Sequence, residues 1–145
     1  MNPVPRIKKE YLGKLVSHIN RKNWWHVPPL DPKAYRKRGK FLASSFSEAE
    51  FYGRPLDEPQ RVKIANPLLG DEKSVWRVLF GRVISVPEPE DRNFLKERLG
   101  LDARMKRAAL DQGYDSIVIL HPKTFATFKK TGKIPRSIEL NVLAA

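Results

Sequence analysis

Hydrophobic and polar positions recur along this chain with the periods of several short helices. Between residues 7 and 20, apolar residues return every three or four positions, which is the spacing of one helix face. The same spacing predicts a second amphipathic helix over residues 72–83. Residues 94–99 and 102–111 predict two more, the latter capped at its N-terminus by Asp102.

Other stretches have the character of strands. The apolar run in residues 116–120 predicts a central, fully buried strand. Four further strands are expected, in residues 23–27, 40–44, 61–65 and 137–143. The one over residues 61–65 alternates apolar and polar side chains, and Asn66-Pro67 is expected to end it because proline cannot donate to a strand ladder.

Two shorter helical segments complete the prediction. Ser47 is expected to cap a short helix that cannot continue past Pro55, and Phe125 and Phe128 belong to another short helix or turn. The strands are too many for a helical bundle, and the helices are not spaced as regular βαβ units. We therefore expect an α+β fold with a small, mostly antiparallel sheet flanked by short helices.

The composition fits one globular domain over residues 1–145, with an N-terminal basic helix in residues 1–22 and a core in residues 23–145. The chain has no cysteine, which excludes disulfides, thiolate metal sites and thiol catalysis. It has no apolar run of the roughly 20 residues that a membrane span needs, and no signal-peptide pattern. We therefore expect a soluble, cytoplasmic protein without membrane partners.

The charge is unevenly distributed. The formal net charge is +12, and residues 1–40 hold 11 basic and two acidic residues, whereas residues 41–100 are nearly neutral. A basic N-terminal face can contact a polyanion such as a nucleic acid, can hold a phosphorylated cofactor, or can simply be solvated. Composition leaves these three alternatives open.

Most signatures of enzymes are absent. None of the three histidines is spaced with another histidine or a carboxylate as metal ligands are, so no metal site is expected. The chain also has no glycine-rich phosphate loop and no Gly-x-Ser-x-Gly elbow.

The motifs that remain form an ordered series. Residues 39–53 contain a Ser-Ser pair after a strand and an Ala-Glu-Phe-Tyr segment on the following helix. In chain order the motifs are Trp25-His26, residues 39–53, Asn66-Pro67-Leu68, Gly113-Tyr114-Asp115-Ser116 and Glu139. This order resembles, over residues 24–143, the small ADP-ribosyltransferase-like domains found in polyvalent proteins of phages and mobile elements.

The resemblance implies a split sheet whose cleft binds NAD as a substrate. It makes Glu139 the catalytic residue, which accepts a hydrogen bond from the 2′-hydroxyl of the nicotinamide ribose. His26 would contact the adenosine-side ribose or a phosphate. Ser44 and Ser45 would line the nicotinamide pocket, and Tyr52 would stack on the nicotinamide ring. These residues are expected to converge on one cleft.

A lone carboxylate suits this chemistry. Breaking the N-glycosidic bond builds positive charge at the anomeric carbon, which a fixed carboxylate stabilises, and the cationic nicotinamide leaves without a general acid. From the strand pattern alone, Glu139 alternates with Ile138 and Leu140, as a solvent-facing residue does. Ser137 stands where arginine-modifying members of the family have a second acid, so arginine is disfavoured as the acceptor.

The leading hypothesis is therefore an ADP-ribosyltransferase-like enzyme that passes ADP-ribose from NAD to a macromolecule, either protein or nucleic acid, or to water. Its natural setting would be a toxin-like effector of a mobile element, delivered to another cell. The alternatives are a nucleic-acid-binding module that uses the basic N-terminal face with Trp24, Trp25 and Tyr35, and a catalytically inactive member of the same fold.

Overall fold

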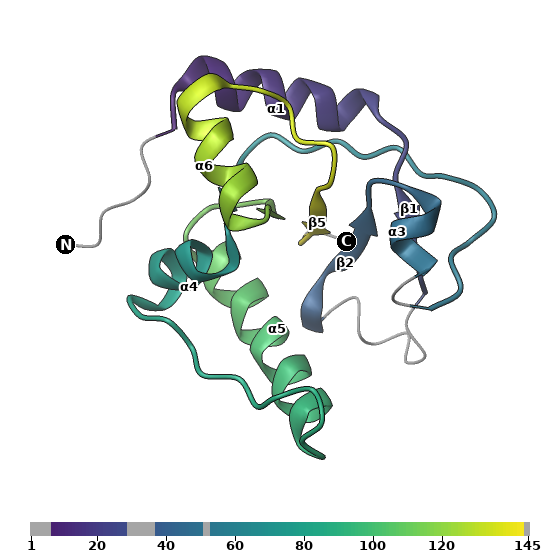
Figure 1. The fold of residues 1–145 in the computed structure, drawn as a ribbon, viewed down its shortest axis with the longest axis vertical. Helices are drawn as coiled ribbons and strands as arrows, with labels where there is room; N and C mark the ends of the chain where they lie inside the picture. Colours follow the sequence, from purple (N-terminus) through teal and green to yellow (C-terminus); the bar gives the residue numbers. More distant parts are fainter. Residues whose placement is uncertain (1–6, 29–36, 51–52, 144–145) are drawn as a thin grey trace.

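The fold is built on one mixed sheet of five strands in the order β1-β2-β5-β4-β3, with helices packed on both faces (Figure 1). The computed structural model describes residues 7–28, 37–50 and 53–143. The strands are β1 (Trp25–His26), β2 (Lys40–Ala43), β3 (Pro67–Gly70), β4 (Ser116–Ile119) and β5 (Glu139–Val142). The α+β class is thereby confirmed.

Strand pairing is antiparallel except between β3 and β4. Parallel neighbours need a crossover connection, and here α4 (Glu72–Phe80) and α5 (Phe94–Asp111) provide it. The five described strands are hydrogen-bonded into one continuous sheet. The two separate sheets that the resemblance implies are therefore not seen in the described part of the chain.

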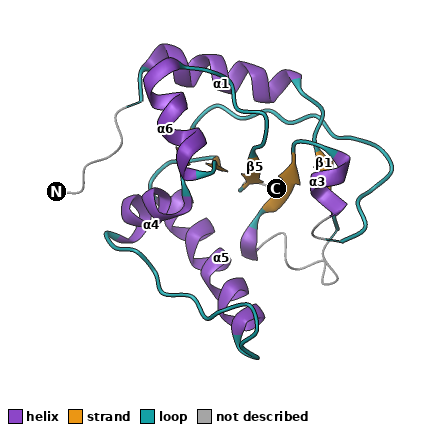
Figure 2. Ribbon diagram, viewed as in Figure 1, coloured by secondary structure: helices purple, strands orange, loops and turns teal. Residues whose placement is uncertain are grey.

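The other helices are α1 (Lys9–Arg21), α3 (Phe46–Glu50) and α6 (Pro122–Thr131), and Figure 2 shows the helices in purple around the strands in orange. The helix ends follow ordinary capping chemistry. Asp71 accepts a hydrogen bond from the Ser74 amide at 2.7 Å at the start of α4, and Gly81 ends that helix with φ 73°. None of the described helices is both long enough and apolar enough to cross a bilayer.

The face of the sheet under α1 and α6 carries the larger apolar core. Trp24, Phe125 and Phe128 are fully or almost fully buried there, and the edge of the Phe128 ring meets Tyr11 of α1 at a centroid distance of 6.3 Å. The buried members of this core are Leu15, Ile19, Trp24, Leu42, Ile64, Leu69, Val118, Leu120, Phe125, Phe128, Ile138 and Leu140. The apolar stripe predicted for residues 7–20 is thus confirmed as the inner face of α1.

The opposite face of the sheet packs on α4 and α5. Its core members are Leu68, Val75, Trp76, Leu79, Leu101, Met105, Ala109, Ile117 and Leu143. This cluster covers the β3–β4 side of the sheet. Along β5, in the middle of the sheet, the residues on this face are the polar Glu139 and Asn141, so the apolar cover ends there.

The strand predicted for residues 61–65 is wrong, and Pro67, expected to end it, is the first residue of β3. Side chains rather than a neighbouring strand bind the backbone of the predicted segment. Asn20 of α1 bonds both the amide and the carbonyl of Ile64, and the Asp115 carboxylate accepts from the amides of Ala65 and Asn66. Proline is tolerated in β3 because it begins an edge strand.

Two helix predictions also need correction. Residues 94–99 and 102–111 form one helix, α5, and Asp102 is not a cap but a nearly buried residue within it. The short helix after β2 begins at Phe46, and the hydroxyl of Ser45, not that of Ser47, accepts the Glu48 amide at 3.2 Å. Both errors arise where a polar side chain suggested a helix start that the surrounding structure places elsewhere.

Candidate functional site

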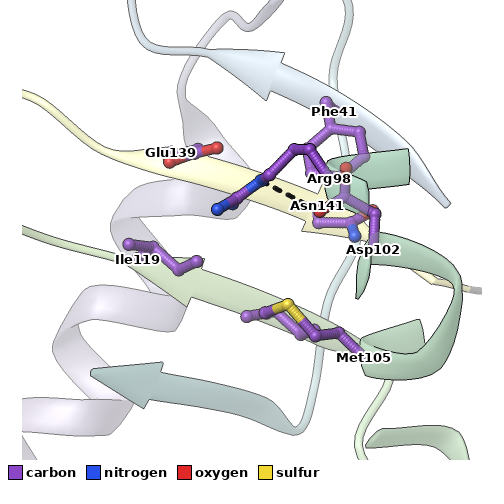
Figure 3. Close-up of a pocket in the computed structure, with 8 residues that line it drawn as sticks. Phe41, Arg98, Asp102, Met105, Ile119, Glu139 and Asn141 are labelled. Atoms are coloured by element: carbon purple, nitrogen blue, oxygen red, sulfur yellow. Dashed lines mark ion pairs between the residues drawn. The ribbon is translucent and has the colours of Figure 1, made fainter. Parts of the chain in front are cut away.

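A pocket lies where α5 crosses the middle of the sheet, on the face away from α1 and α6 (Figure 3). Its walls combine apolar side chains with a carboxylate pair, a guanidinium and an amide. The lining residues are Phe41, Arg98, Asp102, Met105, Ile117, Ile119, Glu139 and Asn141. These lining residues include Glu139, one of the candidate site residues selected from the sequence.

The register of the sheet explains why these side chains meet. In the antiparallel pairs, Glu139 lies opposite Ile119, and Asn141 lies opposite both Phe41 and Ile117. Directly paired residues share a face, and residues two apart on a strand do so as well. The strands therefore present one continuous strip of side chains to α5.

Helical spacing supplies the rest of the pocket. Arg98, Asp102 and Met105 are separated by four and three residues on α5 and so occupy one face of that helix. In Figure 3 the Arg98 side chain extends from α5 across the sheet toward Glu139. α5 thus contributes the positive charge and the second carboxylate.

Arg98 is the centre of an ionic cluster. Its two terminal nitrogens bond the Glu72 carboxylate of α4 at 3.2 and 2.8 Å, and its Nε lies 3.6 Å from Asp102. The charge of Glu139 also acts on Arg98. Three carboxylates therefore surround one guanidinium, so the cluster carries an excess of negative charge when all three are ionised.

Burial alters the acidity of two of these carboxyl groups. It raises the pKa of Asp102 to about 6, although Arg98 and Arg38 oppose the shift. Burial likewise raises the pKa of Glu139, with Arg98 opposing and the negative charges of Glu72 and Asp102 adding to the rise. Both carboxylates are thus short of compensating positive charge.

Asn141 fixes the end of the pocket beside β2. Its Nδ2 donates to the Arg38 carbonyl at 2.9 Å, while its buried Oδ1 has no hydrogen-bond partner among the described residues. Gly39 has φ 87°, and a Cβ there would collide with that Oδ1. Glycine at this turn therefore allows the close approach of the chain before β2 to Asn141.

His26 does not join this pocket. In the sheet it pairs with Leu42, which pairs with Leu140, so it belongs to the face that carries α1 and α6. Its side chain is buried, and Nδ1 lies 2.8 Å from the Phe41 carbonyl. Desolvation lowers the pKa of His26, so a neutral ring is favoured. His26 and Glu139 therefore lie on opposite faces, and their expected convergence is not observed.

The two serines also have structural partners. The buried Ser44 hydroxyl accepts from the Ile138 amide at 3.0 Å and so joins the end of β2 to the start of β5. Ser45 caps α3 through the Glu48 amide. Neither serine lines the pocket. Tyr52 lies outside the described residues.

Sequence reasoning missed Arg98 and Asp102, which do as much as Glu139 to define this pocket. Their separation of four residues on a helix is a recognisable ion-pair spacing, but such pairs usually lie on solvent-exposed surfaces. The partner Glu72 is 26 residues from Arg98, so no local pattern connects them. Among the described residues, no group of histidine and carboxylate side chains is arranged to hold a metal ion.

No family model, curated protein or solved structure matches this chain.

Proposed function

We propose that the pocket around Glu139 binds the nicotinamide end of NAD and cleaves the N-glycosidic bond to nicotinamide. The observation that carries this proposal is the position of the Glu139 carboxylate, which is largely buried beside apolar walls in a cluster with excess negative charge. In this proposal the domain is ADP-ribosyltransferase-like, and NAD is consumed as a substrate.

The charge of the cluster favours a cationic ligand. Glu72, Asp102 and Glu139 share the guanidinium of Arg98, and the charge of Arg38 acts in addition on Asp102, so three carboxylates face two guanidinium groups. The nicotinamide ring of NAD is a cation, and its departure moves the positive charge onto the ribose. A carboxylate already desolvated and short of counter-charge stabilises that developing charge more strongly than a solvated one does.

In the proposed reaction, Glu139 is the residue of this chain that acts on the ribose. Glu139 accepts a hydrogen bond from the 2′-hydroxyl of the ribose and faces the anomeric carbon. The bond between that carbon and the ring nitrogen breaks, and its electron pair stays on the departing, now neutral nicotinamide. A nucleophilic oxygen or nitrogen of the acceptor, or water, then bonds the anomeric carbon and releases a proton.

The apolar lining suits the ring. Phe41 on β2 supplies an aromatic side chain to the lining, and Ile117 and Ile119 on β4 line the same face of the sheet on the other side of β5. Arg98 acts as a positioning residue, because it holds Glu72 and Asp102 around Glu139 without being needed as a proton donor. Ser44, Ser45 and His26 have no role in this version of the proposal.

The pH dependence follows from the raised pKa of Glu139. Only the ionised carboxylate stabilises the cationic ribose, so activity should rise with pH through the pKa of Glu139. Because that pKa is above the usual value for glutamate, the acid limb of the rate profile should lie at a higher pH than an ordinary glutamate gives.

The decisive experiment measures nicotinamide release from NAD by mass spectrometry, with and without cell extract as a source of acceptors. Glu139→Gln should abolish release without lowering the urea unfolding midpoint at pH 7, because burial already disfavours the charged form of this carboxyl group. Glu97→Gln, an exposed carboxylate in the first turn of α5, is the matched control and should leave the rate unchanged. An inactive parent protein, or an active Glu139→Gln variant, would refute the proposal.

The nucleic-acid-binding alternative loses one of its expected contacts. Trp24 is 0% exposed and its Nε1 donates to the Ile19 carbonyl at 2.9 Å, so this ring cannot stack on a base. Tyr35 lies outside the described residues. The distribution of charge between the two faces of the fold, in contrast, supports a nucleic-acid contact.

A further inference from the structure

The basic residues gather on three segments of the fold. These segments are residues 8–22 with α1, residues 61–65 before β3, and residues 122–136 with α6 and the turn that follows it. Together they hold twelve lysines and arginines and one acidic residue, Glu10. The α4–α5 region behaves differently, since residues 71–111 hold nine basic and eight acidic residues. Most of the net charge of +12 therefore belongs to one side of the sheet.

Packing holds these three segments together. The ring of Tyr11 in α1 meets Phe128 in α6, and the αL residue Gly132, just after α6, lies against the Tyr11 ring. The Asn20 side chain of α1 donates a hydrogen bond to the Ile64 carbonyl at 2.9 Å and accepts one from the Ile64 amide at 2.8 Å. Figure 1 shows α6 lying directly beside α1. The fold thus assembles cations that are far apart in the sequence into one surface.

Most of these cations face solvent. The exposed ones are Lys8, Lys9, Lys14, Arg21, Arg61, Lys63, Lys123, Lys130, Lys133 and Arg136. Among the residues that the structure describes, the ion pairs are those of Arg98, on the other face of the sheet. Like charges gathered on one surface repel one another, and a bound polyanion relieves that repulsion.

We propose that this α1–α6 surface binds the phosphodiester backbone of a nucleic acid. α1 has 13 residues and is therefore about 20 Å long, a length that spans roughly six nucleotide steps of a duplex. The surface is thus too extended for a single phosphate group or one nucleotide. Among the described residues of this surface, the exposed side chains that could bind are cations and none is a fully exposed aromatic ring, so we expect binding that is independent of base sequence.

An anionic membrane is a poorer fit to the same charges. Helices that lie on a bilayer insert large apolar side chains below the headgroups. The exposed large hydrophobic residues of the described chain are Phe46, Leu56, Val83, Leu95, Leu99 and Leu110. All of them lie outside the three basic segments, so the α1–α6 surface has nothing to insert.

The test is fluorescence anisotropy with labelled DNA of about 20 nucleotides, single-stranded in one arm and duplex in the other, over about 50–200 mM salt. The variant Lys9→Glu/Lys130→Glu/Lys133→Glu alters exposed positions on α1 and around the end of α6. We expect at least tenfold weaker binding and a salt slope that falls by about three. The arm that binds more tightly identifies the preferred form of the nucleic acid.

The matched control is Lys96→Glu/Arg104→Glu/Arg107→Glu, which makes the same change in net charge at exposed positions of α5. This control variant should weaken DNA binding less than threefold. Glu139→Gln should leave DNA binding unchanged, so a failure of this proposal can be distinguished from a failure of the proposed activity. Circular dichroism and urea unfolding check that both variants fold. If the first does not fold, Lys9→Gln/Lys130→Gln/Lys133→Gln replaces it, with a smaller expected loss.

Three outcomes would overturn the proposal. The parent protein could fail to bind either form of DNA at about 50 mM salt. The α5 control could weaken binding as much as the α1–α6 variant, which would mean that only net charge matters. Binding could also be limited to vesicles of phosphatidylserine and phosphatidylcholine in a co-sedimentation assay, which would assign the surface to a membrane.

Discussion

The two faces of the sheet differ in the kind of side chain that they bury. Under α1 and α6, aromatic and aliphatic side chains are buried completely, and the histidine enclosed there, His26, has a lowered pKa. Under α5, the sheet meets Arg98 and two carboxyl groups with raised pKa values, Asp102 and Glu139. One face is closed by apolar contact, while the other encloses charge around a pocket.

We therefore expect the face under α1 and α6 to provide most of the stability, and the face under α5 carries the groups that could react. Apolar burial contributes about 25 cal/mol per Å² removed from water, whereas a buried carboxylate short of counter-charge costs free energy that the rest of the fold must offset. The α1–α6 side can therefore stabilise the domain while the α5 side keeps groups whose charge is poorly compensated. Four substitutions test this division.

The largest expected effect is the loss of an aromatic ring from the closed face. Phe128 is 0% exposed and packs against Tyr11, so Phe128→Ala should lower the free energy of unfolding by about 3–5 kcal/mol. Phe41→Ala removes the same group from the half-buried pocket wall and should cost less than half as much. Urea unfolding of both variants gives the comparison, and equal losses would contradict the division between the faces.

A change of opposite sign is expected on the pocket face. The pKa of Asp102 is about 6 in the folded protein against 3.8 for the free side chain, so the folded state binds the proton more tightly. The free energy of unfolding should therefore fall as pH rises from about 4 to 6, by roughly 3 kcal/mol at most. Asp102→Asn should remove the contribution of Asp102 to this decline, leaving the part that comes from the raised pKa of Glu139, and should make the protein more stable at pH 7.

The measurement for Asp102 is urea unfolding at several pH values. The parent curve must be compared with that of Asp111→Asn, an exposed carboxylate at the end of the same helix, which should retain the decline. If Asp102→Asn instead destabilises the protein at pH 7, its pairing with Arg98 outweighs the cost of burying its charge.

Local sequence patterns predict part of this fold correctly. The α1 helix and the interior strand β4 are predictable because each carries a strong local signal, a regular apolar stripe in α1 and an unbroken apolar run in β4. The strand predicted at residues 61–65 fails for a non-local reason. Asn20 and Asp115, far away in sequence, bind the backbone groups that a neighbouring strand would have taken.

The candidate site was predictable only in part. The order of motifs selected Glu139, and the pocket contains it. Nothing local distinguishes Arg98 and Asp102 from ordinary solvent-exposed helix residues, because their burial depends on where α5 crosses the sheet. Ser44 and His26 stand next to residues of the pocket face, but strand side chains alternate, and a neighbour in sequence points the other way.

The third substitution tests the contact that holds α6 against α1. Gly132 has φ 73°, and a Cβ there would lie 2.5 Å from the Tyr11 ring. Gly132→Ala should therefore cost about 2 kcal/mol or more, from backbone strain together with displacement of the ring. Gly113, at the end of α5, has φ 90° but open space around it, so Gly113→Ala should show the strain alone, about 1 kcal/mol. Thermal unfolding of the two variants would separate the cost of backbone strain from the cost of displacing the Tyr11 ring. Equal losses of stability would show that the Tyr11 ring moves aside at little energetic cost.

The smallest effect on stability is expected from Glu72→Gln, which removes one carboxylate of the ionic cluster. The ion pair with Arg98 is partly exposed, with side-chain exposures of 36% for Glu72 and 25% for Arg98, so its loss should cost only about 0.5–1 kcal/mol. The effect on acidity should be clearer than the effect on stability. The charge of Glu72 raises the pKa of both Asp102 and Glu139, so its removal lowers both, and Arg98 becomes free to act on them more strongly. NMR titration of the side-chain carboxyl groups should place Asp102 below its parent value of about 6. An unchanged pKa for Asp102 would mean that the charge of Glu72 does not contribute to its acidity and that the three carboxylates do not act as one cluster.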